Sequence, residues 1–267
     1  MTQTEGENAA ATGRPPAVVA RVWGLPLSPM TRAQAVDEVD RLIAAGRPSY
    51  FVTANLHYAM LTAERPELRG VNQRAAFLLA DGAPLVWASR RGATPLPERV
   101  AGSDLVYDLA ARAAQVGHRL YLLGGPTGAA EAAARRLELL YPGLTIAGTA
   151  CPPHRSLEPA EHDALVDGVR RARPDLLLVA FGQPKGEIWI DRHLDELGVP
   201  VSVQVGATLE FVAGRVPRAP GWMQRSGLEW AYRISTDPAR LAPRYARNAL
   251  FLARALGRDL AGGGGRP

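Results

Sequence analysis

Asp81 is the residue whose position in the sequence most favours chemistry. The short apolar run Phe77–Ala80 stops at Asp81-Gly82, which is typical of a buried strand that ends in a turn. In open parallel α/β sheets, ligands bind beyond the carboxyl ends of the strands. A carboxylate at this place is therefore a candidate general base. The alternative is that Asp81 only forms the turn or caps the next helix.

Other expected strands also end in polar residues or glycines. Glycine lets a ligand approach the backbone closely, and the helix N-termini that follow several of these strands attract phosphate. Together these residues favour a nucleotide or diphosphate ligand, although any one glycine could simply form a tight turn. The set consists of Thr53, Asn55, Gly124, Gly125, Gly182, Lys185 and Gly206.

Several other chemistries lack their sequence signatures. Leu123–Gly128 does not have the G-x-G-x-x-G spacing, and no acidic residue closes the next strand, which argues against a dinucleotide cofactor. The histidines show no paired ligand spacing, and there is no Asp-x-Asp to hold a divalent ion against a diphosphate. The absence of G-x-S-x-G argues against a serine hydrolase. We therefore expect neither metal nor cofactor. Arg99 and Lys185 are then candidates to stabilise leaving-group charge, unless they are ordinary surface charges.

The elements that must position these residues alternate along the chain. Apolar strands are expected at 49–54, 77–80, 119–123, 144–150, 175–181 and 201–205, after a short strand pair within 18–27. Helices are expected between them at 31–45, 57–63, 66–74, 83–91, 103–116, 127–140, 159–172 and 186–197. This alternation predicts βαβ units and a parallel sheet. The predicted fold class is α/β, a Rossmann-like parallel sheet with flanking helices and a helical, basic C-terminal appendage.

The composition indicates an ordinary globular protein in a reducing compartment. The 267 residues carry a net charge of +5, a single cysteine and no apolar run long enough to span a membrane. The first residues lack the basic and apolar regions of a signal peptide. We expect a disordered leader at 1–16, a core at 17–213, an appendage at 214–260, a disordered tail at 261–267 and a cytoplasmic location.

The basic charge is concentrated in the appendage. From residue 214 onward there are ten arginines and three acidic residues, which suggests an anionic partner such as a lipid surface, a nucleic acid or phosphates. Pro243 is expected to restart the helix. At about 100° per residue, arginines and apolar residues then form two stripes, and Phe251 falls among the arginines. The stripes are Arg244, Arg247, Arg254 and Arg258, and Leu241, Tyr245, Leu252 and Leu256.

Such a basic amphipathic helix is typical of membrane-surface or partner binding. The alternative is a helix packed on the core with a solvated arginine face. Candidate residues for membrane or phosphate contact are Arg233, Arg240, Arg244 and Arg247.

Taken together, the motifs resemble those of the WecG/TagA/CpsF glycosyltransferases (glycosyltransferase family twenty-six). The resemblance runs from about Val19 to Arg254, with order and spacing preserved. The matching segments are Val52–Asn55, Ala80–Gly82, Glu98–Asp104, Leu122–Gly125, Tyr141–Gly143, Pro174-Asp175, Gly182–Lys185 with Glu187, Val205-Gly206, Gly214–Pro220, and Gly227–Trp230 with Arg233.

The resemblance implies an inverting, metal-independent transfer of a sugar from a UDP-sugar to a polyprenyl-diphosphate-linked sugar in cell-surface polysaccharide biosynthesis. The donors known in the family carry N-acetylmannosamine, its uronic acid or glucose. The resemblance further implies a peripheral location at the cytoplasmic face of the membrane, with an appendage that helps to close the site. It assigns the base to Asp81 and pocket positions to Thr53 and Arg99, and it adds Glu187 to the binding candidates.

Three departures from the family pattern bear on the donor sugar. Gly186 stands where the family usually has Gln, Leu56-His57 follow Asn55 in place of Pro-Glu, and Leu209-Glu210 replace Phe-Asp. Gly186 is expected to leave room for a different substituent or for water.

Two alternatives come from other classes, a nucleotide-cofactor oxidoreductase and a non-catalytic basic nucleic-acid module. Basic residues without an aromatic stacking platform argue against nucleic acid as a partner. The sequence leaves open the donor sugar, the acceptor and a homo-oligomeric state.

Overall fold

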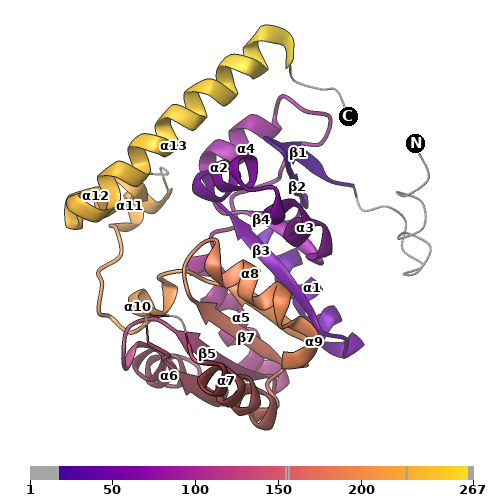
Figure 1. The fold of residues 1–267 in the computed structure, drawn as a ribbon, viewed down its shortest axis with the longest axis vertical. Coiled ribbons are helices and arrows are strands. Elements are labelled where there is room, and N and C mark those ends of the chain that lie inside the picture. Colours follow the sequence, from indigo (N-terminus) through magenta and orange to yellow (C-terminus); the bar gives the residue numbers. More distant parts are fainter. Residues whose placement is uncertain (1–17, 154, 156, 226–227, 264–267) are drawn as a thin grey trace.

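The core is one six-stranded parallel sheet, as the alternation of elements predicts. The computed structural model describes residues 18–153, 155, 157–225 and 228–263, so the predicted leader lies outside the described residues. Figure 1 shows the sheet with helices around it, which confirms the predicted α/β class. In spatial order the strands are β4 (Phe77–Ala80), β3 (Ser49–Ala54), β8 (Val201–Gln204), β7 (Leu176–Ala180), β5 (Arg119–Gly124) and β6 (Thr145–Ala150).

The strand order reverses beside β3. Phe51 of β3 lies opposite Phe77 of β4 on one side and Val203 of β8 on the other. The chain runs outward from β3 to β4 and then crosses over to build the strands on the other side. Ligand sites of open α/β sheets lie at such switch points, beyond the carboxyl ends of the strands. The topology therefore opens the site at the ends of β4, β3 and β8.

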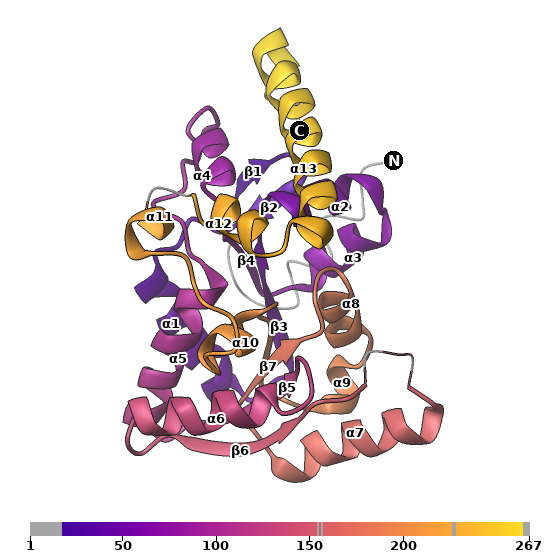
Figure 2. The ribbon, with the colours of Figure 1, turned by 90° about the vertical axis from the view of Figure 1, so that its left-hand side faces the viewer.

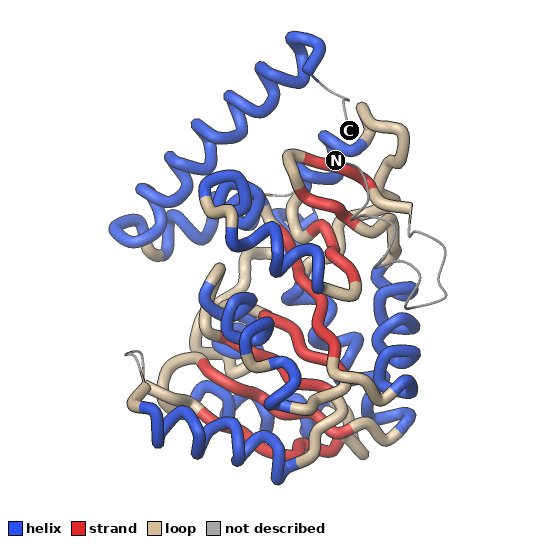
Figure 3. The backbone as a smooth tube through the Cα atoms, turned by 45° about the vertical axis from the view of Figure 1, so that its right-hand side comes forward, coloured by secondary structure: helices blue, strands red, loops and turns tan. Residues whose placement is uncertain are grey.

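Both faces of the sheet are buried, which explains why its strands are continuous apolar runs. Leu176 and Leu178 of β7 pack on one face, whereas Leu177 and Val179 pack on the other. Figures 2 and 3 show helices on both sides of the strands. The first face is covered by α1 (Arg32–Ala45), α5 (Gly102–Val116), α6 (Ala129–Leu140) and α10 (Thr208–Val212). The second is covered by α2 (Leu56–Glu64), α3 (Glu67–Arg74), α7 (Pro159–Ala172), α8 (Lys185–Arg192) and α9 (Leu194–Leu197).

A small hairpin and a short helix extend the β4 edge. β1 (Ala20–Val22) and β2 (Leu25–Leu27) pair antiparallel, and Ser28 N–H donates to Leu78 O of β4 at 2.8 Å. Helix α4 (Ala83–Ser89) follows β4 and packs near the hairpin. The hairpin and α4 therefore lie on the β4 side of the sheet, next to the loop that carries Asp81.

Local sequence signals account for some helix ends, and two predicted boundaries are wrong. Thr31 caps α1 and forms a capping box with Gln34, as its position suggested. Gly128, and not Thr127, precedes α6. The single helix predicted over 186–197 is interrupted at His193, so that α8 and α9 are separate.

The C-terminal appendage is helical. It contains α11 (Gly221–Arg225), α12 (Glu229–Thr236), α13 (Pro238–Arg258) and a π-helical turn, η1 (Asp259–Gly263). The predicted restart at Pro243 is wrong, because this proline lies inside the continuous α13. Residues 261–263 of the predicted tail belong to η1, and residues 264–267 lie outside the described part of the chain. The division into a core and an appendage at residue 214 stays a prediction, since α13 packs on α2.

The far end of α13 is attached to the hairpin. Phe251, which falls among the arginines in the sequence pattern, packs edge-on against Trp23 with ring centroids 6.0 Å apart. The indole Nε1 of Trp23 also donates to Asp259 Oδ2 at 3.1 Å. Figure 2 shows α13 extending past α4. A residue that breaks the amphipathic pattern is thus explained by a tertiary contact with the first strand pair.

We expect Gly124→Ala to lower the free energy of unfolding by about 1–3 kcal/mol. Gly124 has φ +103°, and an added Cβ would lie 2.9 Å from the carbonyl carbon and oxygen of Ala180 on the neighbouring strand. The matched control is Gly168→Ala within α7, where an added Cβ meets nothing within 4 Å. That change should raise stability by about 0.5–1 kcal/mol. Urea unfolding of both variants measures the difference, and equal stabilities would contradict the tight β5–β7 contact.

Candidate active site

A cavity of about 820 Å³ lies beyond the carboxyl ends of the strands, between the core and the appendage. Its volume is within the range of small-molecule sites, about 300–1,000 Å³. Ends of β3, β4, β7 and β8 form its floor, and α12 and α13 contribute to its wall. The predicted site residues that line it are Thr53, Asn55, Asp81, Arg99, Gly125, Gly182 and Gly206, with Arg233 and Arg244 of the appendage.

The remaining predicted site residues lie elsewhere. Gly124 lies just below the cavity, where β5 meets β7, and Lys185 is exposed outside it. Glu187 is buried in the first turn of α8, and burial raises its pKa to about 8. Arg247 points to the outside and pairs with Glu64 at 2.9 Å. Arg240 lies in α13, but its side chain is outside what the structure describes.

Asp81 is fixed at the end of β4 by its backbone. Its N–H donates to Ala54 O at 2.8 Å, and Ala80 O accepts from Val100 N at 2.9 Å. Gly82 then begins α4 as its N-terminal cap residue, without a side-chain cap from Asp81. The carboxyl group is therefore available to the cavity and is not used in capping, the alternative that the sequence left open.

The environment of Asp81 makes its carboxyl a base near neutral pH. Burial raises its pKa to about 7, and the nearby carboxylates of Glu229 and Asp104 act in the same direction. The Arg99 guanidinium and the backbone N–H of Gly102 oppose this rise. A group with a pKa near the working pH is best suited to general acid–base catalysis.

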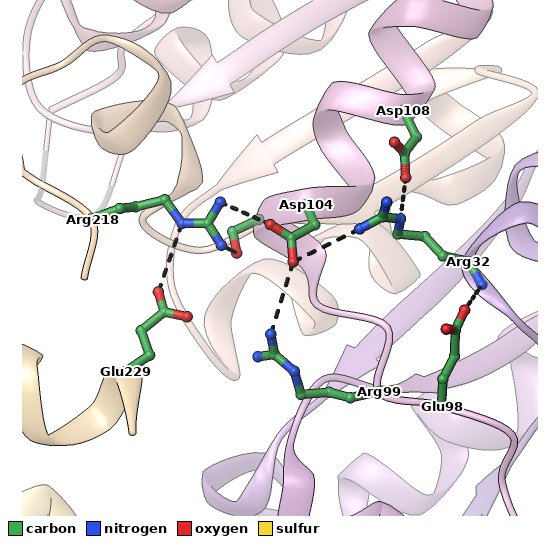
Figure 4. Close-up of polar contacts among 8 residues, drawn as sticks. Arg32, Glu98, Arg99, Asp104, Asp108, Arg218 and Glu229 are labelled. Carbon is green, nitrogen blue, oxygen red and sulfur yellow. Dashed lines mark hydrogen bonds and ion pairs between the residues drawn. The ribbon is translucent and has the colours of Figure 1, made fainter. Parts of the chain in front are cut away.

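An ion-pair network positions Arg99 (Figure 4). Asp104, in the first turn of α5, lies 3.8 Å from Arg99 Nη2, 2.8 Å from Arg218 Nη1 and 4.0 Å from Arg32 Nη1. Arg32 Nε in turn lies 2.5 Å from Asp108 Oδ2. The backbone N–H of Arg32 donates to Glu98 Oε1. One carboxylate thus orders cations from three segments far apart in the sequence.

The same network joins the core to the appendage. Arg218 Nη2 donates to Ser103 Oγ at 2.9 Å, and Arg218 Nε lies 3.9 Å from Glu229 of α12. Glu229 lines the cavity and raises the pKa of Asp81. Sequence reasoning missed Arg218 and Glu229 as site residues, although both stand in segments that match the family motifs.

A second contact holds α13 over the cavity. His57 Nδ1 and Asn248 Oδ1 are 3.0 Å apart, and both residues line the cavity. Burial, together with Arg244, lowers the pKa of His57. The neutral imidazole that this favours can donate from Nδ1 to the amide oxygen. Of the two predicted stripes on α13, Leu241, Tyr245 and Leu252 face the cavity with Arg244 between them.

Two polar residues at the strand ends have structural partners. Asn55 accepts a hydrogen bond from Tyr58 N at 3.0 Å and caps α2 while lining the cavity. Thr53 is buried and donates to Gln204 O at 3.4 Å. Gln183, which the sequence did not single out, donates from Nε2 to Thr53 O at 3.1 Å. The floor of the cavity is therefore preorganised.

The expectation that Gly186 leaves open room is wrong. An added Cβ at Gly186 would lie 2.4 Å from Oε1 and 2.5 Å from Cδ of Gln204. The carboxamide of Gln204, a cavity residue that sequence reasoning also missed, fills this space.

The described side chains contain no group of three or more His, Cys, Asp or Glu residues that could hold a metal ion. In the same part of the chain, no helix has both the length and the apolar character needed to cross a bilayer.

Fold and cavity together define a Rossmann-like α/β protein with a candidate ligand site at its topological switch point. The family model described as "Glycosyl transferase WecG/TagA/CpsF family" matches residues 20–263. The chain therefore belongs to this family and is a glycosyltransferase. Neither the oxidoreductase nor the nucleic-acid alternative gains support from this match.

Two curated relatives carry the same name, N-acetylglucosaminyldiphosphoundecaprenol N-acetyl-beta-D-mannosaminyltransferase. The chain is 31% identical to the protein of Staphylococcus aureus (strain NCTC 8325 / PS 47) over 226 residues. This aligned region covers 82% of this chain and 85% of the relative. The chain is 30% identical over 192 residues to the protein of Bacillus spizizenii (strain ATCC 23059 / NRRL B-14472 / W23), covering 72% and 73%.

We predict that Asp81→Asn stabilises the fold more at pH 8 than at pH 5. The folded-state pKa of about 7 lies above the ordinary value of 3.8, so the native state keeps a proton that the unfolded chain has lost. The stabilisation from Asp81 is complete below pH 3.8 and is lost as pH rises through 7. Asparagine has no charge to desolvate. Thermal melting of both proteins at the two pH values measures the difference, and a melting-temperature gap that shrinks with pH would contradict a raised pKa.

Proposed function

We propose that this glycosyltransferase inverts the anomeric centre, with Asp81 as general base. The observation that carries the proposal is a carboxyl group with a pKa of about 7, fixed at the switch point of the sheet and facing a cavity that contains Arg99. A nucleophilic hydroxyl needs such a base, and the departing diphosphate needs nearby positive charge.

In the proposed reaction the acceptor hydroxyl attacks the anomeric carbon of the donor sugar. Its proton passes to Asp81, while the bond from the anomeric carbon to the UDP oxygen breaks and its electron pair leaves with UDP. Attack from the side opposite UDP inverts the configuration. The cavity supplies Arg99 from the core and Arg233 and Arg244 from the appendage to stabilise the charge on UDP.

We further propose that the donor is UDP-N-acetylmannosamine and that the acceptor is N-acetylglucosamine linked to a polyprenyl diphosphate. The names of the two relatives support the transferred sugar and the acceptor, and the UDP carrier is what the resemblance to the family implies. The reaction would serve the synthesis of a cell-envelope polysaccharide.

Transfer is proposed to be independent of metal ions. The arginines that line the cavity offer the positive charge that a divalent ion would otherwise supply.

We propose a peripheral position at the cytoplasmic face of the membrane, which suits a lipid-linked acceptor. Its support is the outer surface of the appendage, where Arg254 and Arg258 are exposed near Leu250, which is 52% exposed. Trp222 is also exposed, at 59%, and Trp230, at the border of the cavity, is 48% exposed. Basic and aromatic residues of this kind favour an anionic bilayer surface.

Asp81→Asn is expected to lower kcat about 10²- to 10⁴-fold, because the amide cannot accept the proton of the attacking hydroxyl. Affinity for UDP should stay within about threefold, since the arginines remain. The measurement is transfer from UDP-N-acetylmannosamine to a water-soluble polyprenyl-diphosphate-N-acetylglucosamine analogue, with product linkage determined.

The matched control is Asp175→Asn, at the amino end of β7. Asp175 accepts from Arg119 N at 2.7 Å at the edge opposite the cavity, so this variant should turn over normally. Wild-type turnover for Asp81→Asn would rule out Asp81 as the base. The wild-type enzyme should also keep its turnover in excess EDTA, and a strict requirement for divalent metal would contradict metal-independent transfer.

The charge-reversed variant Arg254→Glu/Arg258→Glu should bind anionic vesicles at least about tenfold more weakly, because each basic residue near an anionic leaflet contributes about 1 kcal/mol. The measurement is sedimentation with phosphatidylglycerol-containing vesicles at low salt. Its control, Arg135→Glu/Arg136→Glu on the exposed side of α6, changes net charge equally at the other end of the molecule. Equal losses in both variants would argue against a membrane role for α13.

A further inference from the structure

Gln204 carries a buried donor without a partner. The residue ends β8, is 2% exposed and lines the cavity. Its Oε1 accepts from Phe181 N at 3.3 Å, whereas its Nε2 has no hydrogen-bond partner among the described residues. A buried polar group without a partner costs about 1–3 kcal/mol. Such a cost in a preorganised site indicates that a ligand supplies the missing acceptor.

Gly186 makes this arrangement sterically feasible. The Gln204 carboxamide lies directly over Gly186, so that even a methyl group there would overlap Oε1 and Cδ. Gly186 lies in the first turn of α8, where the backbone is helical and does not itself require glycine. The absence of a side chain at Gly186 thus leaves the space that the Gln204 carboxamide occupies.

The position of Gln204 relative to Asp81 suits the transferred sugar. Strands β4, β3 and β8 lie side by side, with Asp81 after the first and Gln204 at the end of the third. Their strands are two spacings apart, about 10 Å, and the strand register places Asp81 three residues nearer the carboxyl edge than Gln204, about another 10 Å along the strand. Thr53 lies between them on β3 and donates to Gln204 O. A hexose with its anomeric carbon near Asp81 can reach Gln204 through a ring substituent.

Building on the proposed function, we propose that Gln204 is a specificity-determining residue of the donor site. Its Nε2 donates a hydrogen bond to an oxygen of the transferred sugar, either a ring hydroxyl or the carbonyl of an acetamido group, and Gly186 holds it in place by leaving space. The other source of a carbonyl oxygen in the same donor is the uracil base.

The first test removes the donor but keeps the length of the side chain. Gln204→Met should lower kcat/KM for UDP-N-acetylmannosamine about tenfold, as expected for one lost hydrogen bond in a buried site, and leave the affinity for UDP within about twofold. The control is Ser202→Ala, on the same strand and buried, but outside the cavity. It should leave both quantities unchanged, and melting temperatures report whether each variant folds.

The second test is a double-mutant cycle. Gly186→Ala displaces the Gln204 carboxamide and should reduce kcat/KM about as much as Gln204→Ala does. Introduced into Gln204→Ala, the same change should cost less than about twofold, because nothing is left to displace. Additive losses would reject the coupling between Gly186 and Gln204.

Two results would overturn the assignment of Gln204 to the sugar. One is unchanged kcat/KM in Gln204→Met. The other is an equal loss of affinity for UDP, which would place the contact on uracil.

Calorimetric binding of UDP and UDP-N-acetylmannosamine separates this inference from the proposed function. If the wild type binds the UDP-sugar without transferring it, the proposed function fails. The affinity difference between the wild type and Gln204→Met then still decides the role of Gln204. If the wild type binds neither compound, both proposals are rejected.

Discussion

The site depends on the desolvation of one carboxylate. Asp81 is held by strand hydrogen bonds at the edge where the sheet opens, and burial raises its pKa to about 7. The opposing charge of Arg99 keeps the ionised form accessible. Arg99 is itself positioned by Asp104, which also binds cations from two other segments. The surrounding charges therefore set the basicity of Asp81 and fix a guanidinium beside it.

The appendage is part of this electrostatic environment. Glu229 of α12 contributes to the raised pKa of Asp81, and Arg244 of α13 lowers the pKa of His57. The contacts that hold the appendage on the core include Arg218 with Asp104, His57 with Asn248, and Phe251 with Trp23. Movement of α12 or α13 would change the dielectric and the charge around the base. The position of the appendage and the pKa of Asp81 are therefore linked.

Much of this arrangement could be predicted from the sequence, because it follows local rules. Apolar runs with a turn signal gave the strands, and the alternation with helices gave the parallel sheet, whose carboxyl edge brings Thr53, Asp81 and Gly206 together. Two residues from the same reasoning do not line the cavity, namely Lys185, which is exposed, and Glu187, which is buried in the first turn of α8. Both stand in a matching motif, but a motif does not state which way a helix turns its side chains.

The sequence by itself determined the elements, their order and the position of Asp81 at a strand end, since these depend on neighbours a few residues away. Only the tertiary structure decided how distant residues share space and charge. The carboxamide of Gln204 occupies the place beside Gly186, 18 positions earlier, and Glu229 affects Asp81 from a helix at the other end of the chain. Packing and Coulomb interactions act through space, so separation along the chain does not reveal them.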